Sequence, residues 1–291
     1  MKVISRNLKY IVTLAAAAAI GLTAGNIFGQ ETAGKDKTRA EHKNKSFCSD
    51  NNWSSDDKVS FSDLRETTIS ATGSVNVDSG QNGGISIKGE DRSDVLVRAC
   101  VQSWGKTQEG AKAVAGNVKI AMSGTIKAEN SVDDKNWSVS YQLLVPRATN
   151  LNLKAHNGGI SISGVDGSAE FETMNGGVSL NNVAGTIKGR TTNGGVNVNL
   201  SGGTWKGSGL DVQTTNGGVH ISMPENYAAH IETGTVNGGF SSDIPALNVE
   251  KPDKERGHRA TKISTDINGG GAPIRVITTN GGVRINTPDQ D

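Results

Sequence analysis

The sequence repeats the tripeptide Asn-Gly-Gly, each time followed by alternating apolar and polar residues. The clearest copy reads Asn157-Gly158-Gly159-Ile160-Ser161-Ile162. Related copies begin at Asn82, Asn175, Asn193, Asn216, Asn237 and Asn280, and a degenerate copy begins at Asn268. Asn-Gly readily adopts two consecutive positive φ angles, so each copy predicts a sharp corner. The alternation that follows predicts a short strand with one buried face.

The spacing of the corners indicates stacked coils rather than a row of hairpins. From Asn157 to Asn193 the corner recurs every 18 residues, and the next two intervals are 23 and 21 residues. Hairpin turns would recur at about half that interval. A second apolar set, such as Val165 and Phe171, lies between successive corners. We therefore predict an all-β fold, a single-stranded and β-helix-like solenoid with two or three short strands per coil.

Stacking would bring equivalent residues of successive coils to about 4.8 Å from one another. The corner residues would then form an amide ladder of Asn82, Asn157, Asn175, Asn193, Asn216, Asn237 and Asn280. The strand after each corner would add an inward ladder of Ile160, Val178, Val196, Val219 and Phe240. It would also add a neutral outward ladder of Ser161, Ser179, Asn197, His220 and Ser241. One coil buries too little apolar surface to offset its ordering entropy, so each coil depends on its neighbours.

The first 30 residues have the pattern of a signal peptide. Lys2, Arg6 and Lys9 precede an apolar run from Tyr10 to Ala19, which is short for a membrane span. We expect export and no transmembrane anchor once the signal is removed. The mature protein would be periplasmic, displayed on the cell surface or secreted.

Three further regions follow the signal peptide. Residues 31–55 are polar and predict a disordered tether with a disulfide anchor. Residues 56–147 contain longer and less regularly spaced strand candidates, which predict a wider β section that caps the solenoid. Residues 148–291 carry the repeats and a C-terminal cap. The copy at Asn280 follows Asn268 by only 12 residues, so we expect a terminal strand that closes the stack.

Charge and cysteine content restrict the partners. Residues 1–30 hold three of the 30 basic residues and none of the 29 acidic ones, so the mature chain has a formal charge of −2. A nucleic-acid partner is therefore not expected. Cys48 and Cys100 in an exported chain predict one disulfide. The alternative, a reactive thiol pair, lacks the close spacing of a redox motif.

Carboxylates are the first residues to weigh for catalysis, because β-helix enzymes that act on polysaccharides need several of them converging on adjacent coils. The nearest candidates are Glu170, Glu172 and Asp211. Others are scattered beyond them, at Glu225, Glu232 and Asp243. We interpret all of these as solvated strand charges. Convergence of the first three in one groove would favour an enzyme.

Histidines and tryptophans add no catalytic signal. The histidines of the repeats lie on different coils without metal-ligand spacing, at His156, His220 and His230. Trp53, Trp104, Trp137 and Trp205 either pack in the cap and an insertion or form exposed platforms for sugar rings. We predict no catalytic residue, no cofactor and no metal site.

Three features together resemble a known family. An acidic stretch enters a strand at residues 89–95, and a Tyr-x-Leu-x-Val-Pro strand runs from Tyr141 to Pro146 before the Asn-Gly-Gly copies. This pattern resembles the bacterial putative-adhesin family of β-strand-repeat proteins of unknown function, over about residues 59 to 286. The resemblance implies an architecture, and it supplies no catalytic residues to transfer.

These observations predict an exported, non-enzymatic protein that acts in adhesion or as an envelope scaffold. Its partner would be a surface or an extended polymer such as a glycan, bound in register along a flat ladder face. One alternative is a carbohydrate-active enzyme of the β-helix type. Another is a self-assembling scaffold, because open solenoid ends can stack on one another.

Overall fold

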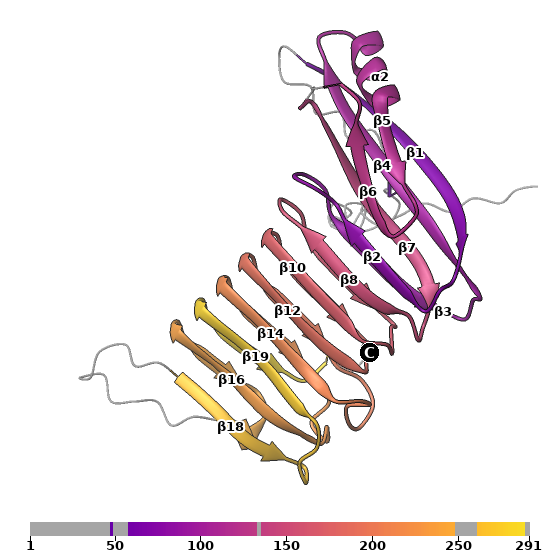
Figure 1. Ribbon diagram of the computed structural model, residues 1–291. Coiled ribbons are helices and arrows are strands. Elements are labelled where there is room, and N and C mark those ends of the chain that lie inside the picture. The colour runs from indigo at the N-terminus through magenta and orange to yellow at the C-terminus, as the bar shows by residue number, and fades with distance from the viewer. Residues whose placement is uncertain (1–46, 49–57, 133–134, 248–260, 289–291) are drawn as a thin grey trace, which may run out of the picture. The chain divides into compact units, whose positions relative to one another are not determined.

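A computed structural model of the chain describes residues 47–48, 58–132, 135–247 and 261–288. These residues form two sheets of ten strands each, with an apolar core between them (Figure 1). The all-β prediction is confirmed, because the described residues add only one α-helix and one short 3-10 helix to the strands. The predicted signal peptide lies outside the described residues, as does the predicted tether except for Phe47 and Cys48. No helix in the described ranges is long and apolar enough to span a membrane.

Sheet 1 consists, in spatial order, of β1 (Val59–Ser70), β4 (Asp94–Gly105), β7 (Trp137–Pro146), β3 (Ile85–Glu90), β9 (Ile160–Ser163), β11 (Val178–Asn181), β13 (Val196–Asn199), β15 (Val219–Ser222), β20 (Val283–Asn286) and β17 (Phe240–Ser242). Sheet 2 consists of β18 (Thr261–Ile267), β16 (Ala229–Asn237), β19 (Pro273–Asn280), β14 (Gly209–Asn216), β12 (Thr186–Asn193), β10 (Ala169–Asn175), β8 (Asn150–Ala155), β2 (Ser74–Asp78), β6 (Thr125–Asn130) and β5 (Val118–Ala121). The helices are α2 (Gln108–Asn117) and η1 (Pro245–Leu247).

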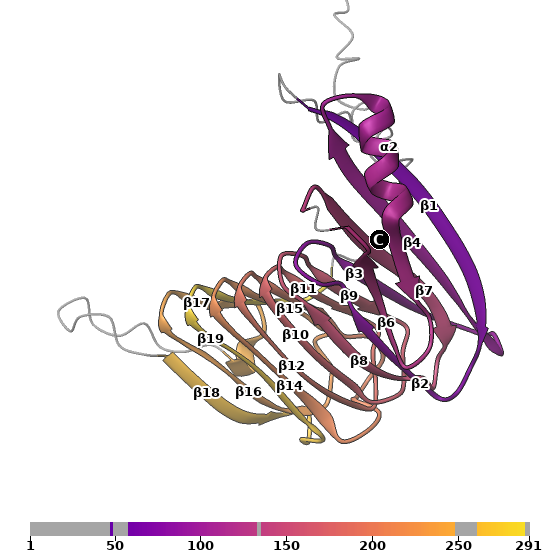
Figure 2. The same cartoon turned by 45° about the horizontal axis from the view of Figure 1, so that its top comes forward.

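Each corner of residues 157–286, except the degenerate copy at Asn268, joins a strand of sheet 2 to a strand of sheet 1 (Figure 2). One repeat therefore contributes one strand to each sheet. The strands pair in parallel with like residues opposite like, as Val178 opposes Ile160 and Val196. At the corners, each asparagine Nδ2 donates to the Oδ1 of the neighbouring asparagine at 2.7 to 3.0 Å. The order of this chain of hydrogen bonds is Asn237, Asn280, Asn216, Asn193, Asn175, Asn157 and Asn82.

The last repeat does not close the stack, so that prediction is wrong. Strands β19 and β20 lie between β14–β15 and β16–β17, and Asn280 pairs with both Asn216 and Asn237 (Figure 1). The inward ladder consequently contains Val283 between Val219 and Phe240. The outer edge of sheet 2 is instead covered by β18, which runs antiparallel to β16.

The corner glycines serve close packing rather than positive φ angles, which corrects the turn prediction. Among the Asn-Gly-Gly copies from Asn157 on, excluding the degenerate one, no glycine has a φ in the left-handed region. A Cβ on Gly176 would lie 2.1 Å from the carbonyl oxygen of Gly158 in the preceding repeat. The equivalent contact recurs at Gly194, 2.2 Å from the carbonyl oxygen of Gly176. Only glycine permits two backbones to approach this closely.

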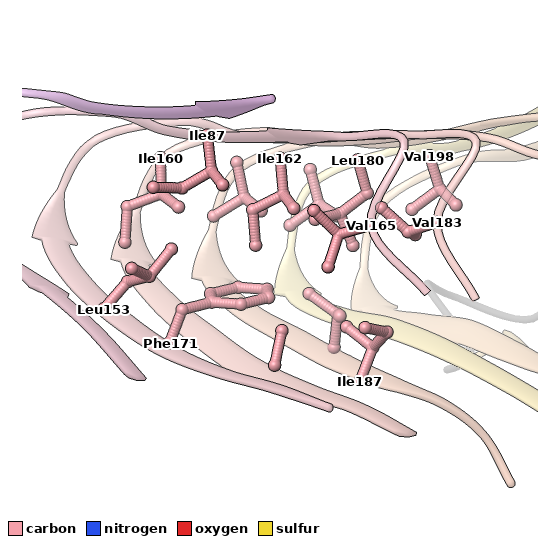
Figure 3. Packing of buried hydrophobic residues seen from close by; sticks show 14 of the residues in the cluster. Ile87, Leu153, Ile160, Ile162, Val165, Phe171, Leu180, Val183, Ile187 and Val198 are labelled. Carbon is pink, nitrogen blue, oxygen red and sulfur yellow. The ribbon is translucent and has the colours of Figure 1, made fainter. Parts of the chain in front are cut away.

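The core between the sheets is a set of aliphatic ladders (Figure 3). Ile160, Ile162 and Leu180 of sheet 1 are fully buried opposite Phe171 and Ile187 of sheet 2. The ring of Phe171 extends over Gly189 of the next strand, where an added Cβ would meet ring atoms at 2.1 Å. The large side chain therefore fills the space that its neighbour leaves empty.

A column of buried threonines supports the corners. Each precedes a corner asparagine by two residues and donates its hydroxyl to the carbonyl of the first corner glycine of the adjacent repeat, at 2.7 to 2.8 Å. The members are Thr173, Thr191, Thr214 and Thr278. Thr235 occupies the same position, but its buried hydroxyl has no hydrogen-bond partner within the described residues. The column satisfies corner carbonyls that would otherwise be buried without a donor.

Replacing Thr191 by valine should lower the free energy of unfolding by about 1 to 2 kcal/mol, because the Gly176 carbonyl loses its donor while the side-chain volume is kept. Urea denaturation would measure the change. Thr235→Val is the matched control, since its hydroxyl forms no such bond. Equal losses in the two variants would contradict a role for the hydrogen bond.

The section before the repeats combines three long antiparallel strands, β1, β4 and β7, with shorter strands, of which β2 and β3 pair in parallel with their neighbours. β4 pairs with β1 and with β7, and α2 packs on β4 and β1. Arg65 of β1 donates to the carbonyls of Ala115 and Val118 at the C-terminal end of α2, at 2.8 and 2.6 Å. Cys48 is bonded to Cys100 of β4, which confirms the disulfide and excludes the free-thiol alternative.

Candidate functional site

The outer face of sheet 1 is uncharged over most of its length. Six neighbouring strands, from β9 to β17, contain no aspartate or glutamate. We call their outward side chains the polar face. Its first row, in spatial order, is Ser161, Ser179, Asn197, His220, Arg284 and Ser241. Its second row is Ser163, Asn181, Asn199, Ser222 and Asn286.

The polar face differs from the predicted neutral ladder at one position. Arg284 stands between His220 and Ser241, because β20 is inserted between β15 and β17. The expectation of a wholly neutral row is therefore wrong. The other five residues of the row occupy the outward positions that were predicted for them.

A hollow of about 460 Å³ lies at the other end of sheet 1 and continues into the polar face. Its floor is backbone at Gly84, Gly159 and Gly177, where the absence of side chains leaves the strands bare. Ser161 and Ser179 belong both to this hollow and to the polar face.

One wall of the hollow is the ring of Phe47, which the adjacent disulfide holds beside β4. The guanidinium carbon of Arg98 lies 5.8 Å from the centre of this ring, within the range of a cation–π contact. Tyr141 lines the hollow from below, and its burial raises its pKa well above the usual range. The Tyr141 hydroxyl therefore keeps its proton at ordinary pH.

The outer face of sheet 2 is built differently. From β2 to β16, seven neighbouring strands carry acidic and basic side chains whose sign alternates from strand to strand. We call these residues the charged face. In spatial order they are Asp78, Lys154, Glu170 with Glu172, Lys188 with Arg190, Asp211, Arg275 and Glu232. Opposite charges on adjacent strands stabilise a sheet, whereas like charges destabilise it.

The three candidate carboxylates all belong to the charged face. Glu170, Glu172 and Asp211 line one hollow of about 550 Å³ together with Lys188 and Arg190. Arg190 binds Glu172 at 2.9 Å, and Arg275 binds Asp211 at 2.6 Å. The three carboxylates thus converge in one hollow, the arrangement that was expected to favour an enzyme. Glu172 and Asp211 are held in ion pairs with arginines, and Glu170 lies opposite Lys188 on the adjacent strand.

The histidines have separate environments. His220 on the polar face hydrogen-bonds Asn286, and His156 lies beside a corner. The Nδ1 of His230 lies 2.7 Å from Asp266, and its Nε2 lies 3.2 Å from the hydroxyl of Ser264. These atoms have the order of a Ser-His-Asp relay, but Glu232 also lies 3.6 Å from Nε2. Within the described ranges no group of three or more His, Cys, Asp and Glu side chains could hold a metal ion.

The tryptophans pack rather than project. Trp205 is buried, and its indole nitrogen donates to the Gly185 carbonyl at 3.0 Å. Trp104 and Trp137 are half-buried, and Trp53 lies outside the described residues. Trp205 also lines a hollow of about 280 Å³ together with Tyr227, and Phe47 borders the hollow beside the polar face.

The two faces differ although the same repeats build both of them. The strand separation is about 4.8 Å on either side, and the charged face shows that ionisable residues are accommodated at this spacing. Strand stacking therefore does not explain why six strands of sheet 1 lack aspartate and glutamate. Five of the corner asparagines, Asn175, Asn193, Asn216, Asn237 and Asn280, have a charged residue five places before them, and these charges alternate in sign in the spatial order of the strands.

The chain was compared with protein families, curated proteins and solved structures. None of the curated proteins matches the sequence. Two similar solved structures are a putative cell adhesion protein from Clostridium sporogenes and a putative adhesin from Bacteroides fragilis. The first is 12% identical with a TM-score of 0.40, and the match covers 78% of this chain and 100% of that chain. The second is 9% identical with a TM-score of 0.36, and the match covers 78% and 97%.

A third similar structure is a putative lipid binding protein from Parabacteroides distasonis, 10% identical with a TM-score of 0.24, over 78% of this chain and 97% of that chain. The family comparison covers most of the sequence, since the profile described as Toastrack DUF4097 matches residues 54–286. The predicted resemblance to a putative-adhesin family of unknown function is thereby confirmed. The chain belongs to the Toastrack DUF4097 family.

Proposed function

We propose that the chain is an exported, non-enzymatic β-solenoid with two strands per coil, and that its polar face binds an extended polymer at a cell surface or in the envelope. The observation that carries this proposal is the contrast between the two outer faces of the same repeats. Sheet 2 pairs its charges with one another, whereas sheet 1 presents hydroxyl and amide groups without carboxylates. Asn199 donates to Asn181, Asn181 donates to Ser179, and His220 hydrogen-bonds Asn286. Within the described residues, the side chains of Ser161, Asn197, Ser222 and Ser241 have no hydrogen-bond partner.

Regular spacing is what would make such a face a polymer site. Serine and asparagine side chains recur about every 4.8 Å from strand to strand, and they offer both donors and acceptors. A chain of sugar hydroxyls laid across the strands meets several of these groups at once, so weak contacts add up. The hollow beside Phe47 provides an apolar wall at one end of the same track.

Substitution of Asn197 tests this assignment. Asn197→Glu places a charge in the middle of the polar face, where it should weaken binding of the mature protein to glycan arrays or to envelope fractions by about tenfold or more. Gln213→Glu makes the same change at an exposed position of sheet 2 and should bind like the unmodified protein. Failure of the mature protein to bind any glycan or envelope fraction would refute the proposal.

Export, the signal peptide and the division into residues 1–30, 31–55, 56–147 and 148–291 belong to the same proposal. A periplasmic, surface or secreted location is supported by the disulfide, because such bonds persist in oxidising compartments. Self-assembly through the ends of the stack stays a prediction, and size-exclusion chromatography over a concentration series would test it.

A further inference from the structure

Arg284 is an exception among the arginines. The described ranges contain seven arginines, and six of them form an ion pair with an aspartate or glutamate, whereas Arg284 forms none. Arg275 of the same repeat lies between Asp211 and Glu232 on the charged face. The arginine on the polar face is thus left with no anionic partner.

The surroundings of Arg284 are polar and open. Its side chain is exposed, with His220 and Ser241 at the paired positions of the adjacent strands. Asn286, two residues along the same strand, binds the ring of His220 and holds it on this face. Asp243, just beyond β17, donates its backbone N–H to the Ile285 carbonyl, and its carboxylate forms no ion pair with Arg284. An unpaired guanidinium presents a fork of donors that matches a carboxylate or another oxyanion.

The character of the whole face limits which anion can bind there. A nucleic acid would need a row of cations to neutralise successive phosphates, and this face has a single arginine among the strands from β9 to β17. A membrane surface would need exposed apolar or multiply basic side chains, and the outward residues of these strands are serine, asparagine, histidine and arginine. The ligand that is complementary to the polar face is a hydroxyl-rich chain with a few acidic groups.

We infer that the polymer bound by the polar face is an acidic polysaccharide, with Arg284 binding a sugar carboxylate and the serine and asparagine rows binding the neighbouring hydroxyl groups. This inference rests on the proposed function and names its ligand class. Arg284 sets the preference for acidic over neutral chains, and the remaining face supplies affinity that both kinds of chain share.

Polygalacturonate and its methyl ester make a matched pair of probes, because they differ in the charge of the carboxyl group. The unmodified mature protein should bind the acid at least about tenfold more tightly than the ester, as expected for one charge-assisted hydrogen-bonded contact. Arg284→Gln should abolish this preference while binding to the ester is kept. Arg190→Gln removes the same charge from the charged face and should leave the preference intact.

Each other result overturns the inference. Equal loss of preference in Arg284→Gln and Arg190→Gln would indicate a general effect of net charge. Equal binding of acid and ester, with both sensitive to Asn197→Glu, would leave the polymer-binding proposal standing and remove its acidic specificity. Binding of neither probe would refute the acidic class, while the array and envelope experiment would decide separately on polymer binding. Circular dichroism of each variant checks that the fold is retained.

Discussion

Replacing Gly176 by alanine should lower the free energy of unfolding by at least about 3 kcal/mol, whereas Gly177→Ala should cost no more than about 1 kcal/mol. The two residues are neighbours in one corner. A Cβ on Gly176 would lie 2.1 Å from the carbonyl oxygen of Gly158 and 2.8 Å from the amide nitrogen of Gly159, both backbone atoms that cannot rotate away. A Cβ on Gly177 would meet its nearest atom, the Gly195 carbonyl oxygen, at 3.4 Å.

The cost at Gly176 arises because the clash must push two stacked repeats apart. Their separation would strain the amide hydrogen bond between Asn175 and Asn157, and the hydroxyl bond from Thr173 to the Gly158 carbonyl. Urea denaturation of the two single variants measures the difference. Equal stability of the two would show that turn conformation, rather than close approach, explains the glycine at this position.

The corner positions and the buried strand residues could be read from the sequence because they obey a local period. Every copy except the degenerate one has asparagine, two glycines and an inward apolar residue at fixed offsets, so Val178 and Val196 were placed opposite one another. The physical role of the corner glycines was predicted wrongly. A positive φ angle and a close approach of two backbones both require glycine, so the sequence does not distinguish between them. A threonine two residues before Asn175, Asn193, Asn216, Asn237 and Asn280 is also visible in the sequence. The hydrogen bonds that four of these threonines form depend on the same contact between repeats.

The spatial order of the repeats could not be read from the period alone. Stacking β16 directly on β14 with aligned corner asparagines would place Glu232 beside Asp211, because each precedes its asparagine by five residues. Arg275 has the same offset from Asn280, and it lies between the two acids at 2.6 and 3.6 Å. Charge alternation therefore favours the insertion of β19 between β14 and β16. The insertion requires a long connection, whose closure costs entropy. The same insertion moved Arg284 into the polar face, which is why the candidate site was only partly predictable.

Reversing the charge of Arg275 should lower the free energy of unfolding by about 2 to 3 kcal/mol. Arg275→Glu removes two half-exposed ion pairs, each worth up to about 1 kcal/mol, and places three acidic side chains on successive strands. Raising the salt concentration to about 1 M should recover much of the loss, since the Debye length then falls to about 3 Å. Adding Glu232→Arg should restore part of it at low salt by recreating one pair of opposite charges.

Arg284→Glu is the matched control, because it makes the same substitution in the same repeat at a residue with no ion pair. Its unfolding free energy should stay within about 0.5 kcal/mol of that of the unmodified protein. If the two reversals were equally destabilising, net charge rather than alternation would account for the effect. If Arg275→Glu were neutral at low salt, the insertion of β19 between β14 and β16 would need a cause other than electrostatics, such as the packing of Ile274 and Val276 in the core.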